Sequence, residues 1–175
     1  MSRVRLYTKA GELQIRRAGP EDIEALMLVM IDVAGWLAGR GIDQWRWVHS
    51  EKGAQTVRKR IEEQEAYVAF LDGEPVATIT LQWDDKLFWG EKGLDKKAGY
   101  IHGVAVKRKI AGQGVGKDLI EWATREIVSR GRRFVRLDYI ESNSGLCGYY
   151  QGLGFEQRGT REGKGWSVRL YEKCA

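Results

Sequence analysis

The sequence has few of the residues that build disulfide frameworks or metal centres. Its 175 residues include only two cysteines, Cys147 and Cys174, and two histidines, His49 and His102. Two cysteines are too few for a disulfide framework, and no histidine or cysteine spacing matches a zinc site. This composition fits a reducing compartment, so we expect a cytoplasmic protein that uses no metal ion.

Long apolar runs and low-complexity segments are also missing. No run approaches the length that spans a bilayer, and the first residues, MSRVRLYTKAGEL, lack the apolar core of a signal peptide. Only two prolines interrupt a chain that is 43% hydrophobic, which is enough for one well-buried core. We therefore expect a single domain over residues 1–175 and no membrane partner.

The charge pattern gives no contiguous basic stretch of the kind that binds nucleic acid. The net charge is +5, but the 29 basic residues are dispersed among 24 acidic ones. A nucleic-acid-binding protein would need a continuous basic face. The pattern instead indicates a mixed-charge surface with one local anion site, and we expect no nucleic-acid partner.

Apolar periodicity predicts an α/β chain in which an antiparallel meander runs into one β-α-β crossover. That crossover makes the strands at 99–106 and 133–140 parallel neighbours. In chain order, the expected elements are strands within 3–17, helices over about 21–41 and 54–65, a strand pair over 66–83 with Asp72-Gly73 at its turn, a strand at 99–106, a helix from 115 closed by Gly131, a strand at 133–140, a short helix at 144–154 and a strand pair over 155–172.

Residues 107–117 read KRKIAGQGVGK and place three alternating glycines between a strand and a helix. Glycines let the backbone approach a ligand, and a helix start attracts negative charge, so the loop is typical of a pyrophosphate site. A dinucleotide fingerprint would need its third glycine at position 117, which is Lys. A P-loop would need glycine at Ala111 and a hydroxyl at Asp118, whose charge would repel a triphosphate.

Two segments, YIHGVAVKRKIAGQGVGKDLIEWA and LDYIESNSGLCGYYQGLGFEQRG, together resemble the GNAT superfamily of acetyl-CoA-dependent N-acetyltransferases, most closely over about 99–157. The resemblance implies the GNAT fold: a mixed central sheet of about seven strands, mostly antiparallel with one parallel pair, flanked by about four helices. It also implies direct transfer, in a ternary complex, from acetyl-CoA to a primary amine of a small molecule. A protein or peptide amine, and a non-catalytic acyl-CoA sensor, stay open as alternatives.

The resemblance assigns residues to the coenzyme. Loop amides would hold its pyrophosphate, the preceding strand would expose backbone groups to its pantetheine arm, and Asn143 matches an asparagine near the coenzyme. The family usually has Arg or Gln where this chain has Ala111, and Arg108, Lys109 or Lys117 would compensate at short range. The implied coenzyme residues are Val104, Ala105, Val106, Gly112, Gln113, Gly114, Val115, Gly116, Lys117 and Asn143.

The resemblance also implies catalytic roles. Tyr150, in YQGLGF, corresponds to the tyrosine that protonates the departing thiolate, and a phenol with an ordinary pKa near ~10 is protonated at neutral pH. His102 lies on the strand where several GNAT enzymes place a base, so that a neutral imidazole would take the ammonium proton. Glu141 and Asp138 are alternative bases or amine-binding carboxylates, and Asp138 is equally suited to be a buried hydrogen-bond acceptor. A splay of the two parallel strands, after residue 104 and near 138, would free amides for the oxyanion.

Aromatic residues are frequent near the expected acceptor site. The chain has seven tryptophans, and Trp83 and Trp89 flank the Asp84-Asp85 turn. In the family such regions wall the acceptor site, where aromatic faces beside carboxylates favour a cationic amine. The exposed edges of the terminal strands would also allow a homodimer.

Overall fold

The computed structural model describes residues 4–175, and the chain forms two compact units. The first unit consists of residues up to Thr80 together with Gly103–Leu119. The second consists of Leu81–His102 and Ile120–Ala175. Among the residues from 4 onward, no helix is both long and apolar enough to cross a membrane.

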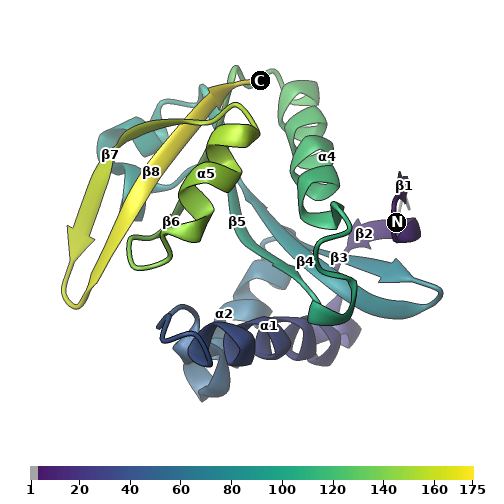
Figure 1. The fold of residues 1–175 in the computed structure, drawn as a ribbon. Helices are drawn as coiled ribbons and strands as arrows, with labels where there is room; N and C mark the ends of the chain where they lie inside the picture. Colours follow the sequence, from purple (N-terminus) through teal and green to yellow (C-terminus); the bar gives the residue numbers. More distant parts are fainter. Residues whose placement is uncertain (1–3) are drawn as a thin grey trace. The chain divides into compact units, whose positions relative to one another are not determined.

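Eight strands form one sheet in the order β1-β2-β3-β4-β5-β6-β8-β7 (Figure 1). β5 and β6 pair in parallel, whereas β1 to β4 and β6, β8 and β7 pair with antiparallel neighbours. This confirms the mostly antiparallel sheet with one parallel pair, with eight strands where about seven were expected. The strands are β1 Val4–Thr8, β2 Gly11–Arg17, β3 Ala66–Leu71, β4 Glu74–Gln82, β5 Ala98–Val106, β6 Phe134–Ile140, β7 Glu156–Gly163 and β8 Trp166–Cys174.

Five α-helices and four 3-10 turns complete the described part of the chain, one α-helix more than expected. The additional helix is α3, whose four residues are too few to show helical periodicity in a sequence. The helices are α1 Ile23–Ala38, α2 Glu51–Glu62, α3 Lys86–Trp89, α4 Val115–Ser129 and α5 Gly145–Gly152, and the 3-10 turns are η1 Pro20–Asp22, η2 Arg46–His49, η3 Gly90–Leu94 and η4 Arg108–Ile110.

In the first unit, local chemistry sets the ends of the elements. Asp72 and Gly73 both have positive φ, 52° and 81°, which is the two-residue hairpin turn that the sequence predicts between β3 and β4. α2 begins at Glu51, earlier than expected, because the Ser50 hydroxyl accepts a hydrogen bond from the Gly53 amide at 3.3 Å.

The core of the first unit lies between its helices and β3. α1 and α2 lie side by side (Figure 1), and they contribute aliphatic side chains to one cluster. Burial of these apolar side chains stabilises the packing of both helices. The cluster consists of Ala18, Leu26, Met30, Ala34, Val48, Val57, Ile61, Ala66 and Val68.

The second unit combines an aromatic core with a buried arginine. Arg136 of β6 is only 4% exposed, and its Nε donates to Glu172 at 2.8 Å. Its Nη1 donates to the Lys92 carbonyl and to the Tyr100 hydroxyl, both at 2.8 Å, and its Nη2 donates to Asp95 at 3.1 Å. The guanidinium therefore ties the η3 segment, β5 and β8 to β6.

Candidate active site

The parallel ladder between β5 and β6 ends just before two candidate residues. Its last pairs are Tyr100 with Arg136 and Ile101 with Leu137, so His102 and Asp138 come next on the two strands. Gly103 has a φ of +58°, a left-handed conformation that interrupts an extended strand and that a residue with a Cβ rarely adopts. The parallel pairing therefore ends at Ile101 on β5 and at Leu137 on β6, and the release of backbone amides for an oxyanion stays a prediction.

A third residue, Asp85, comes from the segment before α3. Asp85 caps this helix, since its Oδ1 accepts a hydrogen bond from the Phe88 amide at 3.0 Å. Its own amide donates to the Gly93 carbonyl at 3.0 Å, which fixes the backbone on the other side. The sequence places Asp85 only in the turn expected near the acceptor site. Its contact with His102 was not predicted, although an aspartate before a short apolar run is a capping signal.

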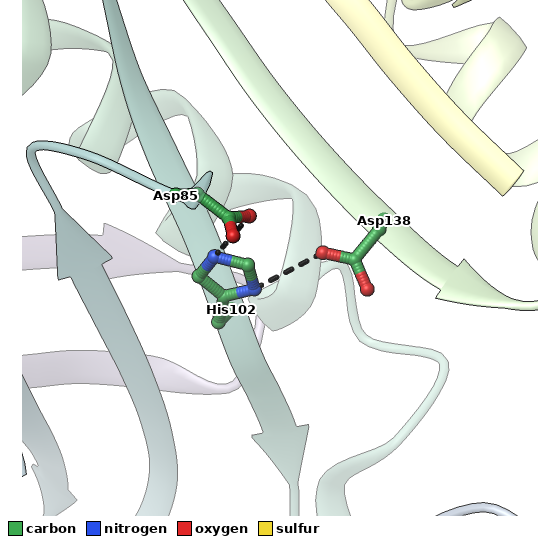
Figure 2. Close-up of side chains that lie close together, drawn as sticks. All are labelled: Asp85, His102 and Asp138. Carbon is green, nitrogen blue, oxygen red and sulfur yellow. Dashed lines mark ion pairs between the residues drawn. The ribbon is translucent and has the colours of Figure 1, made fainter. Parts of the chain in front are cut away.

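These three residues form a clamp around one imidazole (Figure 2). His102 Nε2 lies 3.4 Å from Asp85 Oδ2, and His102 Nδ1 lies 3.2 Å from Asp138 Oδ1. All three side chains are largely buried, with exposed fractions of 16% for His102, 5% for Asp85 and 10% for Asp138. We call this cluster the Asp85–His102–Asp138 clamp.

The clamp changes the protonation state of its histidine. Burial alone would lower the pKa of His102, but the contacts with Asp138 and Asp85 outweigh it and raise the pKa to about 9. The expectation of a neutral imidazole at neutral pH is therefore wrong, because two carboxylates stabilise the charged form. Two carboxylates and one imidazolium leave the clamp with one net negative charge.

The same three residues carry atoms that bind metal ions, and one ligand atom from each lies within 4.8 Å of the others. An imidazole, however, coordinates a given ion through only one of its two ring nitrogens, because the two nitrogens point in different directions. In the clamp each nitrogen faces a different carboxylate (Figure 2). The geometry therefore fits shared protons better than one shared ion.

Tyr150 lies in α5 and is 8% exposed. Its ring stacks on Tyr139 at 5.7 Å and meets Phe155 edge-on at 5.9 Å. Burial, followed by the neighbouring Tyr149 and the charge of Asp138, raises the pKa of Tyr150 well above its ordinary value. A hydroxyl with a raised pKa keeps its proton at neutral pH. Asp138 therefore acts electrostatically on both candidate proton-transfer groups.

Glu141, the alternative base, lies at the end of β6 and is held by β8. Its Oε2 accepts a hydrogen bond from the Ser167 hydroxyl at 2.9 Å, and its Oε1 pairs with Arg169 at 3.3 Å. Among residues 4–175, the ion pairs and hydrogen bonds of the Glu141 carboxylate involve Ser167 and Arg169 and none of the three clamp residues. The structure thus brings His102 together with Asp138 and Asp85 rather than with Glu141.

The glycine loop lies in the first unit and has the backbone that a phosphate site needs. Gly112 and Gly114 both have a φ of +82°, and α4 starts at Val115. A Cβ at Gly112 would meet nothing within 4 Å, and at Gly114 it would meet only the Asp118 carboxylate at 4.0 Å. An open glycine backbone before the first turn of a helix fits the pyrophosphate of coenzyme A.

The basic residues before this loop already have partners. Lys107 and Lys109 both pair with Glu74. The Arg108 guanidinium lies 3.8 Å from the centre of the Trp36 ring, and its amide donates to Asp32 at 2.7 Å. Compensation for Ala111 by Arg108 or Lys109 would therefore require these side chains to leave their contacts.

The other coenzyme candidates are divided between the two units. Val104, Ala105 and Val106 form the end of β5 in the first unit. Asn143 lies in the second unit, where it is buried and its carbonyl accepts a hydrogen bond from the Leu146 amide at 3.1 Å at the start of α5.

Gly93→Ala tests how tightly the Asp85 segment is packed. An added Cβ would lie 2.0 Å from the Asp85 carbonyl oxygen, which is backbone and cannot rotate away. We expect urea denaturation to show a loss of about 1–3 kcal/mol in the free energy of unfolding. Gly35→Ala is the matched control, because nothing lies within 4 Å of its Cβ in α1. We expect that control to gain about 0.5–1 kcal/mol, and equal effects at both sites would contradict the packing argument.

Comparisons with known proteins agree with the fold. The model of the acetyltransferase (GNAT) family matches residues 32–155. An uncharacterized N-acetyltransferase of Bacillus subtilis, YesJ, is 30% identical over 158 residues, covering 87% of this chain and 85% of its own length. The S-(2-succino)cysteine N-acetyltransferase of the same organism is 28% identical over 131 residues, covering 73% of this chain and 76% of its own length.

A solved structure gives the same result in three dimensions. The crystal structure of a GNAT-family acetyltransferase from Listeria monocytogenes superposes with a TM-score of 0.82 at 28% identity. The match covers 98% of this chain and all of that one. The family match over most of the chain, the shared fold and the glycine loop lead to one conclusion: the chain belongs to the GNAT family of acetyltransferases.

Proposed function

We propose that this acyltransferase moves the acetyl group of acetyl-CoA to a primary amine of a small molecule, by direct transfer in a ternary complex. The observation that carries the proposal is the negatively charged Asp85–His102–Asp138 clamp, with Tyr150 electrostatically linked to it through Asp138. A cationic amine is favoured beside a net negative charge, and its reaction needs both a proton acceptor and a proton donor.

The proton balance assigns the two roles. When bound, acetyl-CoA supplies the activated acetyl thioester. A cationic amine first releases one proton to solvent, which frees its lone pair. His102, in its neutral form, then takes the second proton from the attacking nitrogen, and the Tyr150 hydroxyl gives one proton to the departing sulfur. Return of a proton from His102 to the tyrosinate restores the starting state. Glu141 stays the alternative base, acting from its position beside Arg169.

The coenzyme is assigned to the glycine loop and to the end of β5. Backbone amides of Gly112, Gln113, Gly114, Val115 and Gly116, with Lys117, would hold the pyrophosphate. The backbone of Val104, Ala105 and Val106 would hold the pantetheine arm, with Asn143 near the coenzyme. The open, left-handed glycines support this assignment.

A small-molecule acceptor is favoured over a protein for one further reason. A relative matching 73% of this chain is named as an N-acetyltransferase of S-(2-succino)cysteine, a small molecule. Acetylation of a protein or peptide amine is the second candidate. A non-catalytic acyl-CoA sensor is disfavoured because Tyr150 is retained, and its raised pKa keeps the hydroxyl protonated.

Gly114→Glu tests the coenzyme assignment. A glutamate would force a side chain onto a residue whose φ is +82° and would place a carboxylate beside the pyrophosphate. We expect calorimetric titration to show acetyl-CoA binding by the wild type and a loss of at least about 100-fold in the variant. Gly165→Glu, at a turn with a φ of +81° and open space, is the matched control and should bind as the wild type does. Tight binding by Gly114→Glu would place the coenzyme elsewhere.

An acceptor screen then tests the reaction itself. The purified protein is incubated with acetyl-CoA and single amines, starting with polyamines and aminoglycosides, and released thiol is measured. Turnover of a small amine supports the proposal. Turnover of peptide amines alone would favour the second candidate, and binding of acetyl-CoA without any turnover would favour the sensor.

A further inference from the structure

Asp85 is the member of the clamp that no expected catalytic role covers, and it is the most buried of the three. Its two carboxylate oxygens have separate tasks. Oδ1 caps α3, whereas Oδ2 faces His102 Nε2 at 3.4 Å and has no hydrogen-bond partner within residues 4–175. A buried carboxylate oxygen is costly unless it faces a positive charge, so this oxygen needs a proton on Nε2.

The opposite nitrogen faces an oxygen in the same state, since Asp138 Oδ1 is also buried and has no hydrogen-bond partner within residues 4–175. The two sides differ in what holds the carboxylate, because Asp85 is also fixed as the cap of α3. Nδ1 lies 3.2 Å from Asp138, whose charge also acts on Tyr150 of α5. The ionisable groups that face His102 are therefore Asp85, from the segment before α3, and Asp138, from β6. Phe88 of α3 adds an uncharged ring, with its centroid 6.0 Å from that of the imidazole. Of these two carboxylates, only Asp138 also acts on Tyr150, the candidate proton donor.

We propose that Asp85 is a positioning residue that holds the proton on His102 Nε2 and thereby leaves Nδ1, beside Asp138, as the nitrogen that exchanges a proton during acetyl transfer. This inference rests on the proposed function, because it assigns a direction to the proton transfer at the same site. An imidazole whose one nitrogen is held by a buried carboxylate has a fixed ring orientation and a fixed tautomer.

The proton bookkeeping follows from the two contacts. In the resting clamp both nitrogens carry a proton. Release of the Nδ1 proton to solvent gives the neutral imidazole with the remaining proton on Nε2, and Nδ1 then accepts the proton that the amine loses. Nε2 keeps its proton throughout. Because the pKa of His102 is raised to about 9, the imidazole is mostly charged below that pH. The fraction of the neutral imidazole, which acts as the base, therefore increases as the pH rises toward 9.

The two contacts predict the direction in which Asp85→Asn changes the pKa of His102. Asparagine keeps an oxygen that can cap α3, so the fold is preserved while the negative charge is removed. Loss of a negative charge beside the imidazolium destabilises the charged form and lowers the pKa of His102. A charge this close shifts a titration by about one to three pH units. Asp84→Asn, at the exposed neighbouring position, is the matched control.

The experiment is an NMR titration of the imidazole nitrogens in the full-length protein. The chain has only two histidines, so His49→Gln assigns both sets of signals. We expect His102 to titrate near pH 9 in the wild type and in Asp84→Asn, and about one to three pH units lower in Asp85→Asn. Above each midpoint, the wild type should show the Nε2–H tautomer. An unchanged midpoint in Asp85→Asn, or the Nδ1–H tautomer in the wild type, would overturn the proposal.

A kinetic arm separates this proposal from the proposed function. For an amine that the acceptor screen finds, the acidic limb of the kcat/KM profile should move to lower pH in Asp85→Asn by the shift seen in the NMR titration. A limb that stays in place while the titration moves would remove His102 from the base role. If no amine is acetylated, the proposed function fails, but the titration still decides whether Asp85 sets the state of His102.

Discussion

Replacing Tyr150 with Phe is expected to lower turnover by about 100-fold or more, since a positioned general acid contributes about 10²–10⁴-fold. The substitution removes one hydroxyl and keeps the ring that stacks on Tyr139 and meets Phe155 edge-on. Acetyl-CoA affinity should change little, because the expected coenzyme contacts are backbone groups of the glycine loop. Steady-state kinetics with an amine from the screen, together with calorimetry, separates these two effects.

Tyr149→Phe is the matched control, because it makes the same chemical change one residue away on an exposed side chain. We expect its turnover to stay within about twofold of the wild type, in contrast to the loss expected from a general acid. The raised pKa of Tyr150 also predicts that this hydroxyl stays protonated through the ordinary tyrosine range near ~10. Equal turnover in Tyr150→Phe and the wild type would remove Tyr150 from the acid role.

Arg136→Met is expected to cause the largest loss of stability, about 3–5 kcal/mol, because it leaves buried carboxylates without their cation. The guanidinium is 4% exposed and contacts Glu172, Asp95, the Tyr100 hydroxyl and the Lys92 carbonyl. Methionine fills much of the same volume, so the loss reports on charge and hydrogen bonds rather than on a cavity. Urea denaturation measures the free energy of unfolding.

Arg158→Met gives the comparison on the same acidic partner. Arg158 also pairs with Glu172, at 3.2 Å, but its side chain is 44% exposed. An exposed ion pair contributes at most about 1 kcal/mol, so we expect a small loss there. Similar losses for the two variants would show that burial does not determine the strength of this network.

The sequence predicts the parts of the site that depend on neighbouring residues. The glycine loop is an example, because its left-handed residues need glycine and its helix follows directly. The Asp72-Gly73 turn is another, since its two residues define the hairpin. The residue types alone thus indicate a ligand loop and an antiparallel pair without any long-range contact.

The state of His102 could not be predicted in the same way. Its partners come from two other segments, the residue before α3 and the end of the β5–β6 ladder. Neither is adjacent in sequence, and α3 is too short to reveal itself by periodicity. The residues next to His102 in the sequence therefore predict a neutral imidazole, whereas the folded chain places a carboxylate beside each of its two nitrogens.

The parallel pairing of β5 and β6 also has a consequence for how the chain folds. The hairpin of β3 and β4 closes across two residues, whereas β5 and β6 are separated in the sequence by the glycine loop and α4. Longer loops cost more entropy to close, so non-local pairs form later than local ones. His102 and Asp138 follow the last pairs of that ladder. A chain that stalls before this step would keep its hairpins and lack its proton-transfer centre, so catalytic competence should be the last property that refolding restores.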